Sequence, residues 1–320
     1  MTRTRLVVHL GLHKTGTTAV QNYLTQNSYG LYRADAVYPT TGRHPLASTQ
    51  HALLAAAFVP TALIGIFALA GSPDRDLITR AVRQEIELSG RATAVLSSEE
   101  FSRLGPGDVE EFAREFRDYD IEPVIFLRNF TESFEAYYGT LLLTTTVTDP
   151  EFERMLPTDL VAPLQAWATV AAGGRVTVVD YHASPTGNSV ADFLTATGIA
   201  SPYLPDPAVQ ERLNPSLPPA WVALVRDLRR YGIDEDNIRG LLYQLGRVRV
   251  DESQTALPAD ARKRLQESYV ALHTALRAAA FVRWIGDATE PRALTEATEI
   301  TDLVAAVFAL GRAIGDGPNG

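Results

Sequence analysis

The feature that most constrains this chain is an apolar run that passes directly into a glycine-bearing loop and then into a helix. The run covers residues 6–10, the loop reads GLHKTGTT over residues 11–18, and a helical pattern begins near Ala19. In such a unit the loop amides and the helix N-terminus point at one spot, where they bind anions. The sequence therefore predicts a phosphate-binding loop at the carboxyl end of a first strand.

Apolar, β-rich runs alternate with helix-compatible segments beyond this loop, which is typical of an α/β protein. Each run ends in a polar or glycine-bearing loop, as expected of buried parallel strands. We therefore predict a P-loop-like parallel sheet flanked by helices. The expected strands cover residues 6–10, 92–96, 123–127 and 176–179, and the expected helices cover residues 19–24, 75–89, 108–118 and 133–143.

The pattern changes after about Phe193, where proline-bearing loops and helical segments replace the strands. We predict an α/β domain over residues 1–200 and a mostly helical C-terminal extension over residues 201–320, packed on that domain. Helices are expected there over residues 221–231, 259–280 and 300–314.

An apolar insertion at about residues 29–73 separates the first two strands, and its residues 52–71 are uncharged for almost the length of a membrane span. A single span there would separate two strands that are expected to pair in parallel. Pro60 also interrupts any continuous helix, because it removes a backbone hydrogen bond. We therefore expect this segment to be buried and to wall an acceptor pocket.

Composition excludes several classes of function. A formal net charge of −9 argues against a nucleic-acid partner, so an anionic ligand needs a local cluster of donors. The absence of cysteine excludes disulfides, thiolate zinc sites and a cysteine nucleophile. The apolar stretch at the start is too short for a secretory signal, so we expect a cytoplasmic protein without a membrane span. Whether the protein forms a homo-oligomer is left open by the sequence.

The segment GLHKTGTTAVQNYL resembles the 5′-phosphosulfate-binding loop of the sulfotransferase family, in which a K-x-G-T-T core holds the donor. The resemblance implies a sulfotransferase that uses 3′-phosphoadenosine 5′-phosphosulfate (PAPS) and needs no metal. Its acceptor would be a hydroxyl or amine of a small molecule. Arginine and alanine bias hints at a GC-rich bacterial genome, which makes a metabolite or natural product the expected acceptor.

The same resemblance assigns roles within the loop. Lys14 would contact the oxygen that bridges phosphate and sulfate, and backbone and hydroxyl donors to the phosphate would come from Thr15, Gly16, Thr17 and Thr18. His13 is counted with these donor-binding residues, although packing is the expected role of its side chain. Only two of the 29 basic residues, Lys14 and Lys263, are lysines, and a compact ammonium suits a tight loop around a phosphate.

A second anchor follows the strand expected at residues 123–127, where Arg128 stands just before a helix that we expect Thr131 to cap. In the family, the site for the 3′-phosphate of the donor starts with an R-N-P-like motif and has a serine eight positions after the arginine. Arg128 and Asn129 fit this start, but Ala136 occupies the serine position. Ser133 lies one turn earlier on the same helix face and could substitute. A surface ion pair is the other interpretation of Arg128.

A third element is the run AVLSSEEF, where two carboxylates follow the strand expected at residues 92–96. In-line transfer needs the proton of the acceptor removed, and a positioned carboxylate or histidine can take it. Glu99 best matches a glutamate that related sulfotransferases carry there, and His51 and His13 are the fallback candidates. Both carboxylates could instead serve only as favourable charges at a helix N-terminus.

Two other functions stay open. A P-loop small-molecule kinase would place a basic residue directly after Gly16, where this chain has Thr17, and would need Glu99 or Asp180 to hold magnesium. A non-catalytic nucleotide-binding module with a sulfotransferase-like fold would explain the departure at Ala136.

Overall fold

The computed structural model describes residues 3–45, 48–59, 73–144, 160–207, 219–230, 232–245, 254–255, 257, 259–286, 290–291 and 298–299. The chain divides into two compact units. The first unit comprises Met1–Arg128, Asp159–Leu213 and Val270–Pro291, and the second comprises Asn129–Thr158, Asn214–Tyr269 and Arg292–Gly320.

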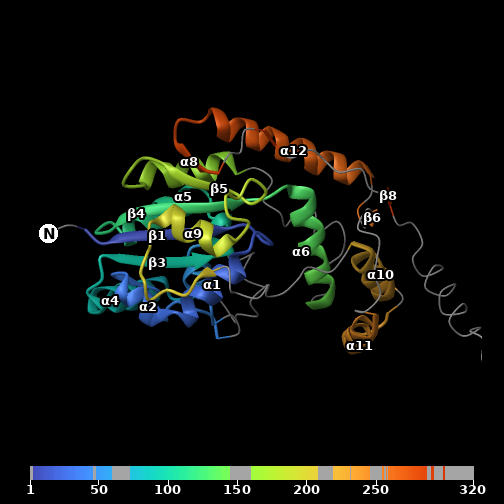
Figure 1. Cartoon of the computed structure of the whole chain (residues 1–320), viewed down its shortest axis with the longest axis horizontal. Helices are drawn as coiled ribbons and strands as arrows, with labels where there is room; N and C mark the ends of the chain where they lie inside the picture. Colours follow the sequence, from blue (N-terminus) through green and yellow to red (C-terminus); the bar gives the residue numbers. More distant parts are fainter. Residues whose placement is uncertain are drawn as a thin grey trace, which may run out of the picture. The chain divides into compact units, whose positions relative to one another are not determined.

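The first unit is built on a six-stranded sheet in which every pair of neighbouring strands is parallel. The strand order is β2-β3-β1-β4-β5-β7, and the central strands β3, β1 and β4 lie side by side in Figure 1. This confirms the predicted α/β class. The bounds are β1 (Arg5–Gly11), β2 (Ala36–Val37), β3 (Thr93–Ser98), β4 (Asp120–Leu127), β5 (Val176–Asp180) and β7 (Val282–Ile285).

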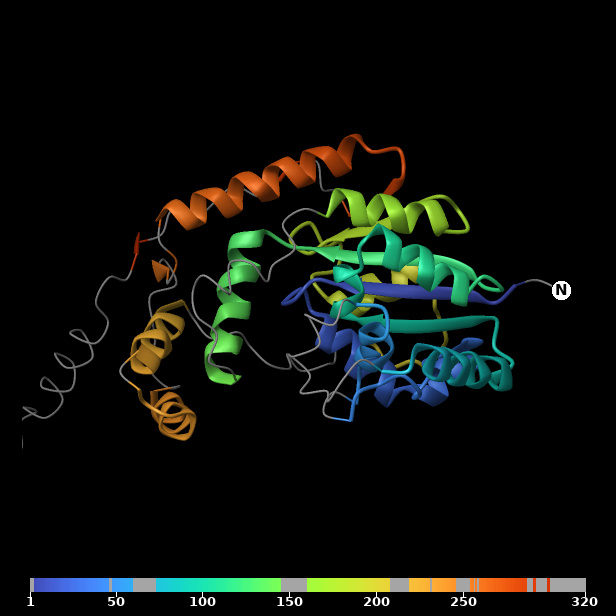
Figure 2. The same ribbon diagram turned by 180° about the vertical axis from the view of Figure 1, so that it is seen from behind.

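Helices cover both faces of this sheet, as the buried runs of a parallel sheet require. One face carries α1 (Thr17–Gln26), α2 (Ser28–Arg33) and α9 (Ser189–Thr197), which enclose a core that includes Val7, Val124 and Phe193 (Figure 1). The other face carries α4 (Arg75–Ser89), α5 (Pro106–Glu115) and α8 (Val161–Val170) (Figure 2). There the rings of Phe112 and Trp167 meet with their centroids 5.2 Å apart.

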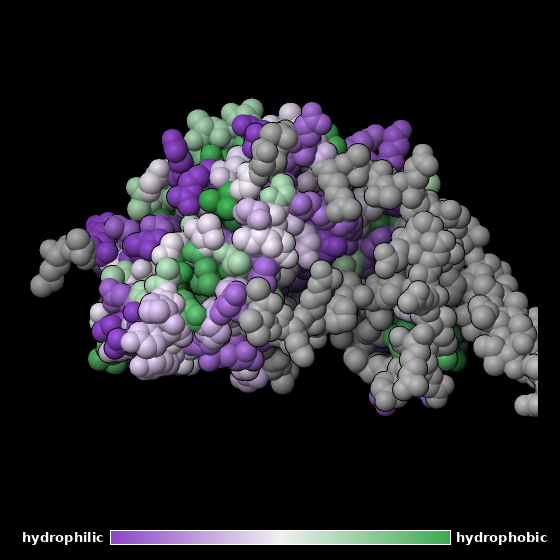
Figure 3. Space-filling model, viewed as in Figure 1, coloured by the Kyte–Doolittle hydropathy of each residue, from purple (hydrophilic) through white to green (hydrophobic). Residues whose placement is uncertain are grey.

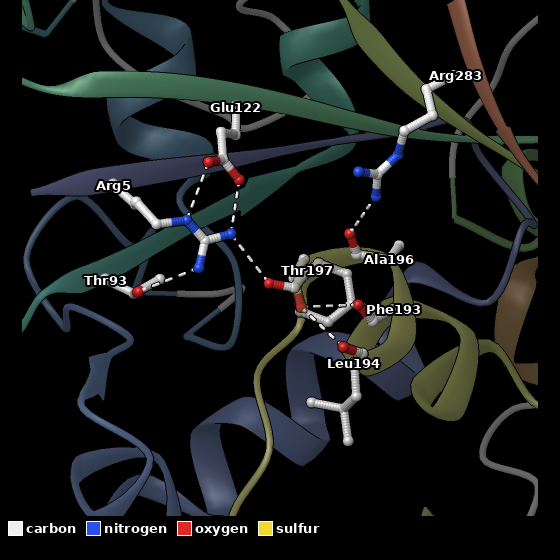
Figure 4. Close-up of polar contacts among 8 residues, drawn as sticks. All are labelled: Arg5, Thr93, Glu122, Phe193, Leu194, Ala196, Thr197 and Arg283. Atoms are coloured by element: carbon white, nitrogen blue, oxygen red, sulfur yellow. Dashed lines mark hydrogen bonds and ion pairs between the residues drawn. The ribbon is translucent and has the colours of Figure 1, made fainter. Parts of the chain in front are cut away.

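Helix α9 is anchored at its C-terminal end by two arginines from the sheet (Figure 4). Arg5 Nη2 donates to the carbonyl of Thr197 and Arg283 Nη2 donates to the carbonyl of Ala196, each at 2.9 Å. Cations at a helix C-terminus stabilise it, because the last carbonyls lack intrahelical partners. Glu122 holds Arg5 through both carboxylate oxygens. At the N-terminal end of α9, Ser189 lies next to Gly16.

The predicted apolar insertion is described only in part. Its first part holds most of α2 and the edge strand β2. The short helix α3 (Ala52–Ala56) begins the uncharged stretch of residues 52–71, and Ala52, Leu54 and Ala55 are buried there. Residues 60–72, on which most of the predicted pocket wall falls, lie outside the described residues. Within the described part of the chain, no helix is both long and apolar enough to cross a membrane.

Figure 3 shows small apolar areas over the first unit, separated by hydrophilic side chains. The exposed aromatic residues of this unit include Tyr29 and Tyr203, whose ring centroids are 6.0 Å apart. The Arg33 guanidinium lies 4.6 Å from the centre of the Tyr203 ring. Scattered exposed apolar residues of this kind are ordinary on a folded protein.

The second unit contains α6 (Phe130–Thr144), α10 (Pro219–Arg230), α11 (Glu235–Leu245) and part of α12 (Ala259–Ala278). It also holds a two-stranded parallel sheet of β6 (Gln254–Thr255) and β8 (Thr298–Glu299). The predicted cap of α6 was wrong by two residues: Asn129 Oδ1 accepts from the amide of Thr131 at 2.9 Å, so the helix starts at Phe130. The helix predicted over residues 300–314 lies outside the described residues.

The predicted boundary at residue 200 differs from this division. Strand β7 lies well beyond residue 200 in the chain, yet it pairs with β5 and completes the edge of the sheet. Three of its four residues are only partly buried and Arg283 is exposed, so β7 lacks the continuous apolar run that marks the inner strands.

Candidate active site

Four neighbouring strands end at one edge of the sheet, and the predicted site residues follow them. In the register of the sheet, Leu10 stands beside Ser98, Gly11 beside Phe126 and Leu127 beside Asp180. Ligands of open parallel sheets bind beyond such carboxyl ends. The loop after β1 therefore meets the segments that begin at Glu99, Arg128 and Tyr181.

The loop turns through two residues with left-handed backbone geometry, Lys14 with φ 65° and Gly16 with φ 83°. Gly16 cannot be replaced without a shift, because a Cβ atom there would lie 2.5 Å from Ser189 Oγ. A Cβ atom on Gly11 would collide with the Thr17 side chain. Both glycines thus let the loop pass close to its neighbours.

The threonine hydroxyls of this loop are used inside the protein. Thr15 Oγ1 donates to the carbonyl of Leu12 at 2.7 Å, and Thr17 Oγ1 donates to Glu99 Oε1. A hydroxyl has one hydrogen to donate, so in this structure neither group has one left for a phosphate. This differs from the predicted hydroxyl contacts of Thr15 and Thr17. The half-buried Thr18 stands at the second position of α1.

The backbone amides of the same loop remain available as donors. No carbonyl oxygen among the described residues accepts from the amides of residues 15–18. Residues 17 and 18 open α1, where the first amides of a helix have no intrahelical partner. Unpaired amides at a helix N-terminus, with the positive end of its dipole behind them, form an anion site.

The ammonium of Lys14 interacts electrostatically with two other predicted site residues, Glu99 and Arg128. Burial lowers the pKa of its ammonium, the Glu99 carboxylate raises it, and the Arg128 guanidinium lowers it further, with a net decrease. The ammonium is therefore close enough to both groups to interact with them. The structure brings together Lys14, Glu99 and Arg128, which the sequence placed after three different strands.

Glu99 opens the short 3-10 helix η2 (Glu99–Arg103) directly after β3. Its carboxylate accepts from the Thr17 hydroxyl, and its side chain is almost fully buried. Its backbone carbonyl accepts from Ser102 Oγ at 2.7 Å. The side chain of Glu99 thus contacts the loop, and its main chain is fixed within η2.

Arg128 is held against the loop from the other side. Its Nη1 donates to the carbonyl of Lys14 at 2.7 Å, and its guanidinium carbon lies 4.9 Å from the centre of the Tyr181 ring. Such a cation–π contact orients a guanidinium without using its donors. Tyr181 did not figure among the predicted site residues, although it directly follows the buried strand β5.

Ser133 lies on α6 in the second unit, with its hydroxyl buried, whereas Arg128 closes the first segment of the first unit. The structure does not place these two units relative to one another, so the predicted role of Ser133 at the 3′-phosphate stays a prediction.

His51 is fully buried, and both of its ring nitrogens are occupied by the backbone. Its Nε2 donates to the carbonyl of Pro39 at 2.9 Å, and its Nδ1 accepts from the amide of Ser97 at 3.1 Å. Burial and the charge of Arg43 lower its pKa to about 3, although both hydrogen bonds act in the opposite direction. The predicted use of His51 as a base is therefore not supported, because neither nitrogen can take a proton from an acceptor.

Comparisons with known proteins return one structural likeness. A solved structure of a sulfotransferase from Alicyclobacillus acidocaldarius matches 76% of this chain and 97% of its own, at 17% sequence identity and a TM-score of 0.44. No protein-family model matches the chain, and no curated protein sequence matches it. The argument for function below rests on the residues of this chain.

Two further charged residues stand behind the loop that sequence reasoning did not assign. Glu100 and Arg103 form a buried pair on η2, with Glu100 Oε2 3.2 Å from Arg103 Nε. Burial raises the pKa of Glu100 to about 6, although the charge of Arg103 acts against this rise. Across the described residues, no group of three or more His, Asp or Glu side chains is placed to hold a metal ion.

Proposed function

We propose that this chain is a sulfotransferase that moves a sulfuryl group from PAPS to a hydroxyl or amine of a small-molecule acceptor. The observation that carries the proposal is the meeting of Lys14, Glu99 and Arg128 at one anion-binding loop. A leaving phosphate needs a positive group, an acceptor needs a base, and a bisphosphorylated nucleotide needs a second cation. Lys14, Glu99 and Arg128 are a cation, a carboxylate and a second cation, so they match these three needs.

The reaction is an in-line displacement at sulfur. The acceptor oxygen or nitrogen forms a bond to sulfur while the bond between sulfur and the bridging oxygen of the donor breaks. The electron pair of that bond stays on the 5′-phosphate, where the Lys14 ammonium and the loop amides stabilise the developing charge. Glu99 takes the acceptor proton, and adenosine 3′,5′-bisphosphate leaves as the second product.

The test is transfer itself. Purified protein is incubated with PAPS carrying ³⁵S and with fractionated pools of small-molecule alcohols, phenols and amines. Label in an organic product that depends on both protein and acceptor supports the proposal. Tight donor binding without transfer to any pool would favour the non-catalytic module instead.

One observation favours the kinase as a second candidate. The hydrogen-bonded pair of Thr17 and Glu99 offers a hydroxyl and a carboxylate oxygen at a phosphate loop, which is the kind of pair that holds magnesium in P-loop enzymes. Lys14 precedes Gly16 instead of following it, which weighs against that chemistry. A kinase would transfer ³²P from ATP with magnesium to an acceptor, and a sulfotransferase would not.

A further inference from the structure

A buried ion pair lies behind the loop that carries Lys14. Glu100 and Arg103 are three residues apart on η2, a spacing at which side chains eclipse one another in a 3-10 helix. Their side chains are only 4% and 5% exposed. A buried pair of this kind is weak evidence for stability, since desolvation offsets the attraction. The function of this pair is therefore sought in its contacts with other residues.

The other contact is with the loop. Arg103 Nη2 lies 3.3 Å from His13 Nε2, and Glu100 Oε1 lies 3.8 Å from that same nitrogen. A guanidinium can only donate, so His13 Nε2 accepts and the ring carries its proton on Nδ1. Burial and the charges of Arg103 and Lys14 lower the pKa of His13 to about 3, which keeps the ring neutral. Nε2 of His13 is thus occupied by Arg103, and the ring keeps one donor, the N–H at Nδ1.

His13 immediately precedes Lys14, whose left-handed backbone is unfavourable for a residue other than glycine. Such a conformation persists only where surrounding contacts fix it. Three contacts do so here. Arg103 holds the His13 side chain, the Thr15 hydroxyl holds the Leu12 carbonyl, and Arg128 holds the Lys14 carbonyl.

We propose that Arg103, itself fixed by Glu100, is a positioning residue that acts through His13 to keep Lys14 in its left-handed conformation. Arg103 does not touch the reacting atoms. Its effect on catalysis rests on the proposed function, because it is exerted through the ammonium of Lys14. Its effect on the conformation of Lys14 does not depend on which anion the loop binds.

Two conservative variants separate this role from folding. Arg103→Lys keeps a cation beside Glu100, but a single ammonium cannot bond Glu100 and His13 in the way that the guanidinium fork does. His13→Phe keeps the ring volume and removes the acceptor. Arg83→Lys is the matched control, because Arg83 also bridges two partners, Asp118 at 2.6 Å and the Glu115 carbonyl at 2.9 Å, away from the loop.

The first measurement is independent of activity. In protein labelled with ¹³C and ¹⁵N lysine, only Lys14 and Lys263 give native signals, and Lys14→Ala identifies which signal is which. Arg103→Lys and His13→Phe should both shift the backbone signals of Lys14 and leave those of Lys263 in place. Arg83→Lys should shift neither. Unchanged Lys14 signals in the two loop variants would overturn the inference, whatever the activity.

The second measurement is kcat for sulfuryl transfer. Misplacing a catalytic group by about 1 Å can lower a rate by ~10²-fold, so each variant should lose about tenfold or more in kcat. The donor KM should rise by a smaller factor, since the loop amides remain. The double variant should lose no more than the worse single variant, because both changes break the same contact between Arg103 and His13.

Unchanged kcat alongside shifted Lys14 signals, or fully additive losses in the double variant, would contradict the positioning role of Arg103. A wild-type protein without any transfer would refute the proposed function and leave the first measurement valid.

Discussion

Glu99 and Glu100 are adjacent in the chain, yet their surroundings give them different chemistry. Glu100 is paired with Arg103, whose Nε lies 3.2 Å from Glu100 Oε2. Glu99 accepts from Thr17 and stands in the field of the Lys14 ammonium. In the proposed transfer the acceptor proton has to be taken next to the loop, and we therefore propose Glu99, not Glu100, as the base.

Glu99→Gln should therefore lower transfer by roughly 10²–10⁴-fold and leave donor binding in place, because an amide can accept from Thr17 but cannot act as a base. Single-turnover transfer and donor titration check this. Glu111→Gln, which changes a carboxylate on α5 paired with Arg75, is the control and should behave as wild type. Equal transfer by Glu99→Gln and wild type would assign the base elsewhere.

Arg128 contacts both the loop, through the Lys14 carbonyl, and the aromatic ring of Tyr181. We propose that it binds the 3′-phosphate of the donor, and a hydrogen bond between charged groups is worth ~1.5–3 kcal/mol. Arg128→Ala should therefore erase most of the preference for PAPS over a donor without the 3′-phosphate. Arg91→Ala removes a guanidinium that stacks on Tyr32 at 4.0 Å and should keep the preference. Full discrimination by Arg128→Ala would place the 3′-phosphate elsewhere.

At the scale of elements, the loop after β1 depends on how closely it approaches α9. Gly16 combines a positive φ with contact to Ser189 at the start of α9, and α9 is itself held by Arg5 and Arg283. Gly90 also has a positive φ of 62°, but a side chain there would meet open space.

Gly16→Ala should therefore destabilise the protein more than Gly90→Ala, whose effect is backbone strain of ~1–2 kcal/mol. Adding Ser189→Gly should recover the part of the loss that comes from the collision. Denaturant unfolding of the single and double variants measures this difference. Equal losses at Gly16 and Gly90 would show that the close approach to α9 contributes nothing.

The sequence predicted some elements well because their signals are local. Helix α4 has the predicted bounds, since Asp74 caps its start at the Leu77 amide and Gly90 ends it in left-handed geometry. The inner strands were predicted with errors of a few residues, because continuous apolar runs mark them. Strands β2 and β7 were missed, since two and four residues at sheet edges give no pattern.

The candidate site shows the same division. Glu99 and Arg128 follow strands directly, and Lys14 lies in the short loop after β1, so their meeting could be predicted from the strands that precede them. Arg103, Tyr181 and Ser189 could not be predicted, because their contacts depend on the register between segments far apart in the chain. The occupied nitrogens of His51 were equally hidden, since their partners come from Pro39 and Ser97.

At the scale of the whole molecule, the buried His9 and His51 and the partly buried His13 make the stability of the fold depend on acid. Burial lowers the pKa of His9, His13 and His51 to about 3, below the value of 6.5 for an exposed histidine. The unfolded chain therefore binds more protons than the folded one between these pH values. Stability from these groups is fully present above pH 6.5 and is lost as the pH falls toward 3.

Each histidine should contribute a slope of up to about 1.4 kcal/mol per pH unit in this window. Glu100 opposes them between its usual pKa of 4.5 and its folded value of about 6, because there the folded state holds the extra proton. Denaturant unfolding across pH 4–8 should show stability falling toward acid, with a shallower fall in His9→Phe. An unfolding free energy that does not change with pH in this range would show that the fold does not hold these rings in the neutral form.

The central claim is that Lys14 acts on a sulfuryl group in transfer, and the chain supplies its own control in Lys263, an exposed lysine paired with Glu267 at 3.9 Å. The deciding measurement follows ³⁵S-labelled acceptor and adenosine 3′,5′-bisphosphate together from PAPS. We predict that the two products form in a one-to-one ratio. Lys14→Ala should lower the rate of transfer by about a hundredfold or more, which corresponds to ~3 kcal/mol of transition-state stabilisation. Lys263→Ala should match wild type. Near wild-type turnover by Lys14→Ala, or transfer of phosphate from ATP in place of sulfate from PAPS, would contradict the account.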